Sequence, residues 1–101
     1  MSDACVTAVG GGELKLFGVI DYRAGPALRE QGAALIKASD APAMVLDCSA
    51  IVKSSSVGLA LLLAFMRDAQ AAGKSVSVRA MPQGMKEIAQ VSGLTELFEQ
   101  R

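Results

Sequence analysis

The stretch from residue 43 to residue 66 constrains the fold more than any other part of the chain. It begins with a continuous apolar run, passes through a polar segment and ends in a second, longer and strongly apolar run. A short apolar run is typical of a central, buried strand, whereas the longer one is typical of a helix. The stretch therefore predicts a strand over residues 43–48, a turn over 49–55 and a helix from residue 56 or 57 to residue 72, which Gly73 ends.

Three consecutive serines, Ser54, Ser55 and Ser56, stand where this helix begins. The start of a helix leaves backbone N–H groups without partners and carries partial positive charge. Such a position suits a serine cap, a bound anion or a phosphoryl group carried by one of the serines. Two interpretations stay open: the serines form only a turn and an N-cap, or they form a docking or phosphorylation point.

The remaining segments complete a β-β-α-β-α-β-α-α order. Alternating residues predict strands over residues 4–9 and 13–20, joined at a glycine cluster, and a further strand over 74–79. Helical spacing predicts an amphipathic helix over 26–37 and two short helices near the end of the chain. Their apolar positions are Met85, Ile88 and Ala89 in the first, and Leu94, Leu97 and Phe98 in the second. This order predicts an α/β fold, a single domain over residues 1–101 with a mixed four-stranded sheet and helices mainly on one face.

Individual positions add detail to this scheme. Leu14 and Leu16 are expected to face the same side of their strand. Asp21 is expected to cap the helix that follows it. Gly32 has two interpretations: it lets its helix pack close to the sheet, or it only weakens the helix.

Charge and hydropathy exclude several classes of function. The chain carries ten basic and ten acidic side chains, and its formal net charge is zero. Because nucleic-acid affinity comes mostly from neutralising phosphates, a chain without a basic block is not expected to bind nucleic acid. The N-terminus shows no secretory signal, and the longest apolar run, residues 57–66, is too short to cross a bilayer. We therefore expect a cytoplasmic protein without direct membrane insertion.

The inventory of reactive side chains argues against an enzyme. The sequence contains no histidine, which removes Ser-His-Asp and Cys-His pairs and histidine metal sites. Cys5 and Cys48 lie in apolar, strand-like runs, and they are expected to be buried thiols rather than a disulfide or a metal site. No phosphate-binding or dinucleotide-binding glycine pattern is present. Asp47, at the end of the central strand, has a structural turn role or a binding role. We expect no cofactor, no metal and no catalysis.

The helix after the serines has almost no polar face in its first half. A helix that is apolar all round is either enclosed or packed against a partner. We expect a partner surface near Val57, Ala60, Leu61 and Ala64. The alternative is a wholly internal helix that the last two helices cover.

Taken together, these segments resemble the STAS domain family, which includes bacterial anti-sigma factor antagonists and domains attached to transporters. The resemblance covers nearly the whole chain. It rests on the order and spacing of four segments, which read GVID at 18–21, VLDCS at 45–49, SSVGL at 55–59 and SGL at 92–94.

Within the family, the run at residues 58–63 is most similar to the STAS subunit of the Mla phospholipid-transport ABC complex. The resemblance implies a non-enzymatic adaptor that binds the ATPase subunit, and through it an inner-membrane permease, in the maintenance of outer-membrane lipid asymmetry. The adaptor would be cytoplasmic and peripheral to the inner membrane. The partner-binding residues that it implies are Ser54, Ser55, Ser56, Val57, Gly58, Leu59 and Leu61.

The alternative within the same family is an anti-sigma factor antagonist that phosphorylation of Ser56 regulates. The family's key hydroxyl falls on Ser56. The chain departs from the antagonists on both sides of it: Ser55 stands where they carry Asp, and Val57 stands where they carry a small residue.

Overall fold

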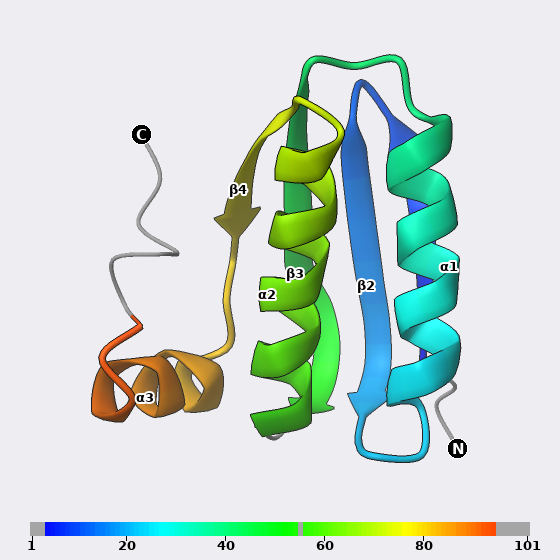
Figure 1. The fold of residues 1–101 in the computed structure, drawn as a ribbon. Helices are drawn as coiled ribbons and strands as arrows, with labels where there is room; N and C mark the ends of the chain where they lie inside the picture. Colours follow the sequence, from blue (N-terminus) through cyan, green and yellow to red (C-terminus); the bar gives the residue numbers. More distant parts are fainter. Residues whose placement is uncertain (1–3, 55, 95–101) are drawn as a thin grey trace.

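The computed structural model describes residues 4–54 and 56–94, apart from the side chain of Ser54. Its elements are β1 (Cys5–Gly10), β2 (Glu13–Ile20), α1 (Gly25–Ala38), β3 (Ala43–Ser54), α2 (Ser56–Ala71), β4 (Ser75–Arg79) and α3 (Gln83–Val91). This order confirms the predicted sequence of elements up to the first of the two short helices (Figure 1). The last predicted helix, which carries Leu97 and Phe98, lies outside the described residues.

The strands form one mixed sheet in the order β1-β2-β3-β4, as predicted. β1 and β2 are antiparallel, and the turn between them uses Gly10, Gly11 and Gly12 with φ angles of 96°, 61° and 82°. Such positive φ angles are open to glycine at little cost, which explains the glycine cluster at this turn. β3 lies parallel to β2 on one side and to β4 on the other. Parallel neighbours need a long crossover, and α1 and α2 supply the two crossovers.

β3 is longer than predicted. The strand continues to Ser54, so the predicted turn over residues 49–54 is wrong. Here β2 supplies a backbone partner, since the two strands pair at Ala50 and Ile51 after one shift in register, and at Lys53 and Ser54 after a second. Ile51 and Val52 are β-branched and favour a strand, and the backbone pairing that β2 supplies outweighs the turn preference of the serines around them.

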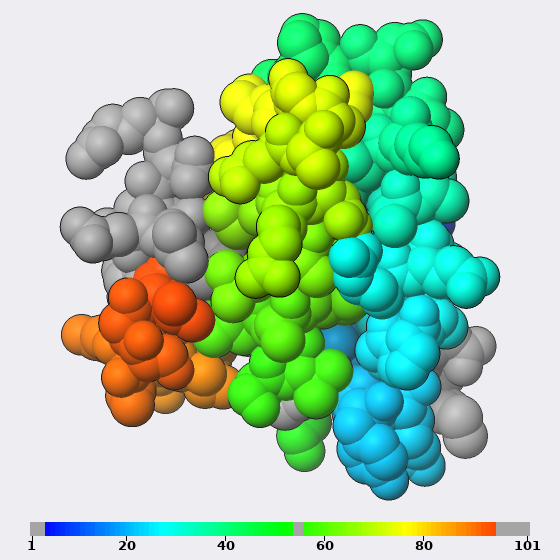
Figure 2. All heavy atoms as spheres, viewed as in Figure 1, coloured from blue at the N-terminus to red at the C-terminus, as the bar shows by residue number. Residues whose placement is uncertain are grey.

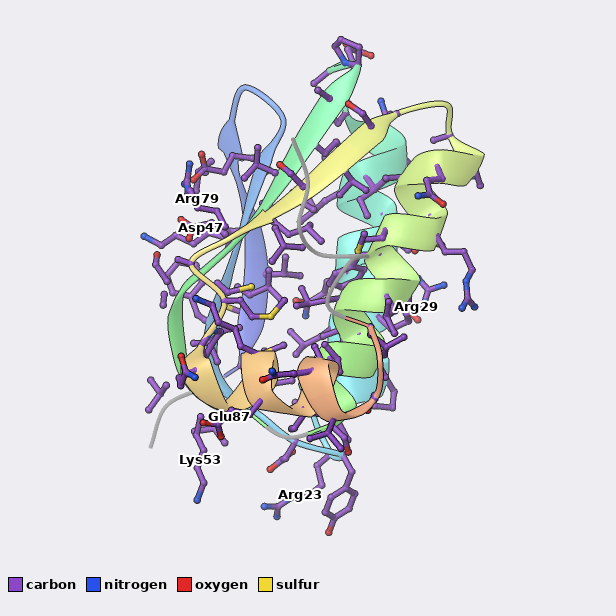
Figure 3. All side chains as sticks on the ribbon, turned by 90° about the vertical axis from the view of Figure 1, so that its left-hand side faces the viewer. Arg23, Arg29, Asp47, Lys53, Arg79 and Glu87 are labelled. Carbon is purple, nitrogen blue, oxygen red and sulfur yellow. The ribbon has the colours of Figure 1, made fainter. Side chains whose placement is uncertain are left out.

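The two long helices cover one face of the sheet. Figures 1 and 2 show α1 and α2 side by side over this face, and α3 beside α2 at the β4 edge. Figure 3 views the molecule from the side and shows α1 and α2 on one side of the sheet and Asp47 and Arg79 on the other. The core lies between the sheet and the helices, and its largest fully buried side chains include Leu14, Leu16, Leu28, Leu46, Leu62 and Phe65. The prediction that Leu14 and Leu16 share a face is confirmed.

The two long helices approach each other closely at Gly32. A Cβ built on Gly32 would lie 2.2 Å from a ring carbon of Phe65 in α2. The interpretation of Gly32 as a close-packing position is therefore correct, but the neighbour is α2 rather than the sheet. On the outer side of the same contact, Arg29 of α1 binds Asp68 of α2 through both guanidinium nitrogens, with Nη2 at 3.1 Å from Oδ1.

Candidate protein-binding site at the start of α2

The parallel strands β2 and β3 end at the same edge of the sheet, and both long helices begin there (Figure 1). Ser56 is the first residue of α2, and its side chain is exposed. Ser55 and the side chain of Ser54 lie outside what the structure describes. The described part of the serine cluster is thus an exposed hydroxyl at a helix N-terminus, where backbone N–H groups and partial positive charge favour an acceptor or an anion.

The first turns of α2 divide the predicted binding residues into two groups. Gly58, Leu59 and Leu61 are buried, so these side chains hold the helix on the sheet. Ser56 and Ala60 are exposed one turn apart, and Val57 is half-buried. The alternative of a wholly internal helix is wrong, because Ser56 and Ala60 give α2 an exposed, uncharged stripe at its start.

A turn before α1 borders this stripe. A Cβ built on Gly25, at the start of α1, would lie 3.3 Å from Cγ1 of Val57, so the two helix starts are in contact. The turn itself exposes Tyr22, which is 75% accessible, and the Arg23 guanidinium lies 5.8 Å from the centre of the Tyr22 ring. Tyrosine and arginine are enriched among the residues that dominate protein interfaces.

Asp21 holds this turn in place. Its Oδ1 accepts hydrogen bonds from the backbone N–H groups of Arg23 (3.0 Å) and Ala24 (3.2 Å), and these bonds, with Ala24 the main cause, lower the pKa of Asp21. The expectation that Asp21 caps α1 itself is wrong, since the N-cap of α1 is Ala24 and no side chain caps it. A proline stands in the first turn of α1, where a missing N–H leaves no donor unsatisfied, so the helix begins there without a side-chain cap.

Exposed residues at the end of β3 extend the same edge. Val52 is 71% accessible, and Lys53 is exposed. Figure 3 shows Lys53 and Arg23 at the same end of the molecule. The sequence analysis missed Tyr22, Arg23, Val52 and Lys53. The sequence did carry a signal for Tyr22. It is the single tyrosine of a chain that contains no tryptophan, and this large aromatic residue stands in a polar turn directly after a strand.

Asp47 belongs to a different part of the molecule. It is a buried carboxylate on the open face of the sheet, away from α1 and α2 (Figure 3). Oδ1 accepts a hydrogen bond from the backbone N–H of Ser49 at 2.9 Å, and Oδ2 accepts one from Arg79 at 3.0 Å. The Ser49 N–H, followed by Arg79, lowers the pKa of Asp47 to about 2. Arg79 also pairs with Glu13 at 2.5 Å, so one guanidinium joins β2, β3 and β4. The structural role of Asp47 is therefore the one that its contacts support.

Both cysteines are thiols in the structure. Cys48 is buried, and burial raises the pKa of its thiol to about 12, which keeps it protonated and unreactive. Cys5 is half-buried on β1. Among residues 4–54 and 56–94, no group of three or more cysteine and acidic side chains is placed to hold a metal ion. Within the same residues, none of the helices is both long enough and apolar enough to span a bilayer.

The family comparison matches residues 7–99 to the model described as MlaB, STAS domain. Among solved structures, an anti-sigma factor antagonist from Mycobacterium paratuberculosis is 27% identical over 98% of this chain and 84% of its own, with a TM-score of 0.75.

The anti-sigma factor antagonist SpoIIAA in its unphosphorylated form is 18% identical over 93% of this chain and 84% of its own (TM-score 0.68). The phosphorylated form of the Bacillus cell fate determinant SpoIIAA is 21% identical over 93% and 86% (TM-score 0.66). These two likenesses concern the fold. No curated protein matches the chain.

Proposed function

The chain belongs to the family of MlaB-type STAS domains, and from this premise we propose that it is a non-enzymatic adaptor of an ABC-type phospholipid transport complex. In this proposal it binds the ATPase subunit, and through it the inner-membrane permease, and it supports their assembly or activity. The protein would work in the cytoplasm, peripheral to the inner membrane, and serve the maintenance of outer-membrane lipid asymmetry.

The exposed start of α2 is the observation that carries this proposal. Ser56 and Ala60 form an uncharged stripe that the sheet and the neighbouring helices leave open, while Leu59 and Leu61 fix the helix beneath it. A rigid, small-residue surface lets a partner helix or loop approach closely without a large ordering cost. Tyr22 and Arg23 on the adjoining turn add the residue types that contribute most to interface affinity.

In this arrangement the residues at the start of α2 have separate roles. Ser56 offers a hydroxyl that both donates and accepts hydrogen bonds, and Ala60 offers a contact without steric bulk. Gly58, Leu59 and Leu61 act from below by positioning the helix. Ser54 and Ser55 belong to the proposed contact through their place in the chain beside Ser56.

The test is binding to the ATPase subunit of an ABC-type phospholipid transporter from the same organism, measured with purified proteins. We expect Ser56→Arg and Ala60→Arg each to weaken binding by about tenfold or more, because a cation without a partner would be buried in the contact. Gln70→Arg is the matched control, since Gln70 is exposed near the other end of the same helix. Wild-type affinity in both Ser56→Arg and Ala60→Arg, or no binding to the ATPase at all, would exclude this contact.

A second candidate is an anti-sigma factor antagonist switched by phosphorylation of Ser56. The exposed hydroxyl of Ser56 at the start of α2 favours it, as does the likeness to the antagonist from Mycobacterium paratuberculosis. A phosphate would add about −1.5 to −2 charges at a helix N-terminus, which stabilises the helix and changes the surface offered to a partner. Arg23 and Lys53 lie at the same end of the molecule.

This second candidate is tested by incubating the protein with the cognate kinase and ATP, followed by mass spectrometry. The candidate requires one phosphoryl group on the wild type and none on Ser56→Ala. An unmodified wild-type protein would leave the adaptor as the remaining function. Equal modification of Ser56→Ala would show that another residue accepts the phosphoryl group.

A further inference from the structure

The outer edge of β1 differs from the other edge of the sheet. No strand of the described residues pairs with β1 on the side away from β2, and residues 5–10 contain no charge and no proline. The β4 edge, in contrast, lies between Lys74 and Arg79. Charged residues and prolines are the usual protection of an edge strand against pairing with another chain. β1 is therefore the unprotected edge, with unpaired backbone donors and acceptors that a further strand would satisfy.

The flank of α1 above this edge is also uncharged. Arg29 and Gly32 face α2, so the exposed residues on the other side of the helix stand over β1. This flank carries small or uncharged side chains at helical spacing, all exposed: Ala27, Gln31, Ala34 and Ala38. Sheet edge and helix flank thus form one continuous surface without charge.

We propose that a second copy of this chain occupies this surface, with the two β1 strands paired antiparallel about a two-fold axis near Thr7. β1 and α1 run in the same direction (Figure 1), so an axis that pairs the strands antiparallel also places the two α1 helices antiparallel. The result is a continuous eight-stranded sheet with four long helices on one face. A two-fold contact of this kind uses the same surface on both copies and closes on itself.

Charge complementarity supports a second copy as the occupant. Glu30 and Lys37 are exposed at the rim of the α1 flank, and neither forms an ion pair within the described part of the chain. Because α1 meets its copy antiparallel near Ala34, Glu30 of each copy lies opposite Lys37 of the other. The uncharged centre of this surface and the Glu30 and Lys37 side chains at its rim are therefore complementary to the same surface of a second copy.

The layer spacing also fits. Neighbouring strands lie about 4.8 Å apart and packed helices about 8–10 Å apart, so each helix takes the width of roughly two strands. α1 contacts both β1 and β2, so in the combined sheet each α1 lies over its own copy's two edge strands. The alanines of the flank keep the facing sides of the two α1 helices free of bulk. α1 lies in front of β1 and beside α2 (Figure 1), and α2 lies on the side of α1 away from the proposed contact, so the start of α2 stays open in the dimer and this inference does not depend on the proposed function.

The first test is sedimentation equilibrium of the purified chain from micromolar to millimolar concentration. We expect a monomer–dimer equilibrium in the wild type. Thr7→Glu places like charges opposite each other at the axis but faces Lys15 within its own chain, so the fold is kept and dimerisation should weaken at least tenfold. Ser75→Glu on the β4 edge is the matched control. A wild type that stays monomeric at all concentrations, or a dimer that Thr7→Glu leaves intact, would overturn the proposal.

The second test is charge reversal on α1, which leaves β1 unchanged. Glu30→Lys and Lys37→Glu each create two like-charge pairs across the axis and should each weaken the dimer several-fold. The double variant restores opposite charges, so we expect it to dimerise like the wild type. A double variant as weak as the two single variants would show that Glu30 and Lys37 do not face each other. Circular dichroism of each variant separates loss of pairing from loss of fold.

Discussion

At the scale of single residues, the most constrained side chain is Asp47. It is 4% accessible, yet its two oxygens are satisfied by the Ser49 N–H and by Arg79. Arg79 is bound by Glu13 as well, which gives one cation and two carboxylates across β2, β3 and β4. A buried carboxylate with such partners is stabilised as the anion, and removal of one partner leaves an uncompensated charge.

The pKa of Asp47 gives a pH-dependent prediction. The folded-state pKa of about 2 lies below the ordinary aspartate value of 3.8, so the anion stabilises the fold above pH 4 and this contribution is lost as the pH falls through about 2. We expect Asp47→Asn to lower the free energy of unfolding by about 2 kcal/mol at pH 7 and by much less at pH 2. Urea denaturation of both proteins at several pH values measures the difference.

Glu13→Gln is the control for this experiment, because it removes the outer carboxylate but keeps the pair between Asp47 and Arg79. It should cost less than Asp47→Asn at pH 7. A difference between wild type and Asp47→Asn that does not change between pH 7 and pH 2 would contradict the assignment of the stabilisation to the carboxylate.

At the scale of elements, the contact between α1 and α2 depends on a missing side chain. Glycine in the middle of a helix is unfavourable by itself. At position 32 the close approach of the Phe65 ring leaves no room for a larger side chain, which explains why a glycine stands there. Arg29 and Asp68 then join the same helices on the solvent side. Since Phe65 and Leu62 also cover the sheet, the position of α2, and with it the open stripe at its start, depends on this contact.

Gly32→Ala and Gly84→Ala separate helix preference from packing. Gly32→Ala forces a methyl group into the Phe65 ring and should lower the free energy of unfolding by about 1–3 kcal/mol despite the better helix preference of alanine. Gly84 lies in α3 with nothing within 4 Å of a built Cβ, so Gly84→Ala should stabilise by up to about 1 kcal/mol. Thermal unfolding measures both. Stabilisation by Gly32→Ala would contradict the close contact.

The elements were largely predictable from the sequence because their signals are local. The spacing of Leu28 and Ile36 and the glycines at 10–12 are read from neighbouring residues. The extension of β3 to Ser54 was not predictable in this way, since it depends on backbone pairing with β2, more than thirty residues earlier. The partner of Gly32 was unpredictable for the same reason: the sequence indicates a close neighbour but does not say which element supplies it.

At the scale of the whole molecule, the candidate site combines one predictable part with one that only the fold reveals. Ser56 and the residues after it carry a sequence signal because a serine cluster precedes an apolar helix. Tyr22 and Arg23 carry no such pattern, and they join the site through the contact of Gly25 with Val57 at the start of the two helices. The same holds for the β1 edge, whose lack of protection is visible only once the order of the strands is known.

Lys74 connects the two crossover units, and its substitution tests how much this connection stabilises the fold. Its Nζ donates to the carbonyls of Ser39 (2.7 Å) and Ala41 (2.9 Å), which tie the segment after α1 to the start of β4. Lys74→Met keeps the apolar stem but loses both bonds, so we expect a loss of about 1–3 kcal/mol in the free energy of unfolding.

Urea denaturation followed by far-UV circular dichroism measures this loss, and the slope with urea should stay unchanged because the same surface unfolds. The control is Lys86→Met on α3, an exposed lysine whose side chain forms no hydrogen bond or ion pair within the described residues, and it should shift stability by less than about 0.5 kcal/mol. If Lys74→Met unfolded at the same urea concentration as the wild type, the bonds to Ser39 and Ala41 would add nothing. If Lys74→Met unfolded in two separate transitions, the hydrogen bonds of Lys74 would be what makes the two crossover units unfold together.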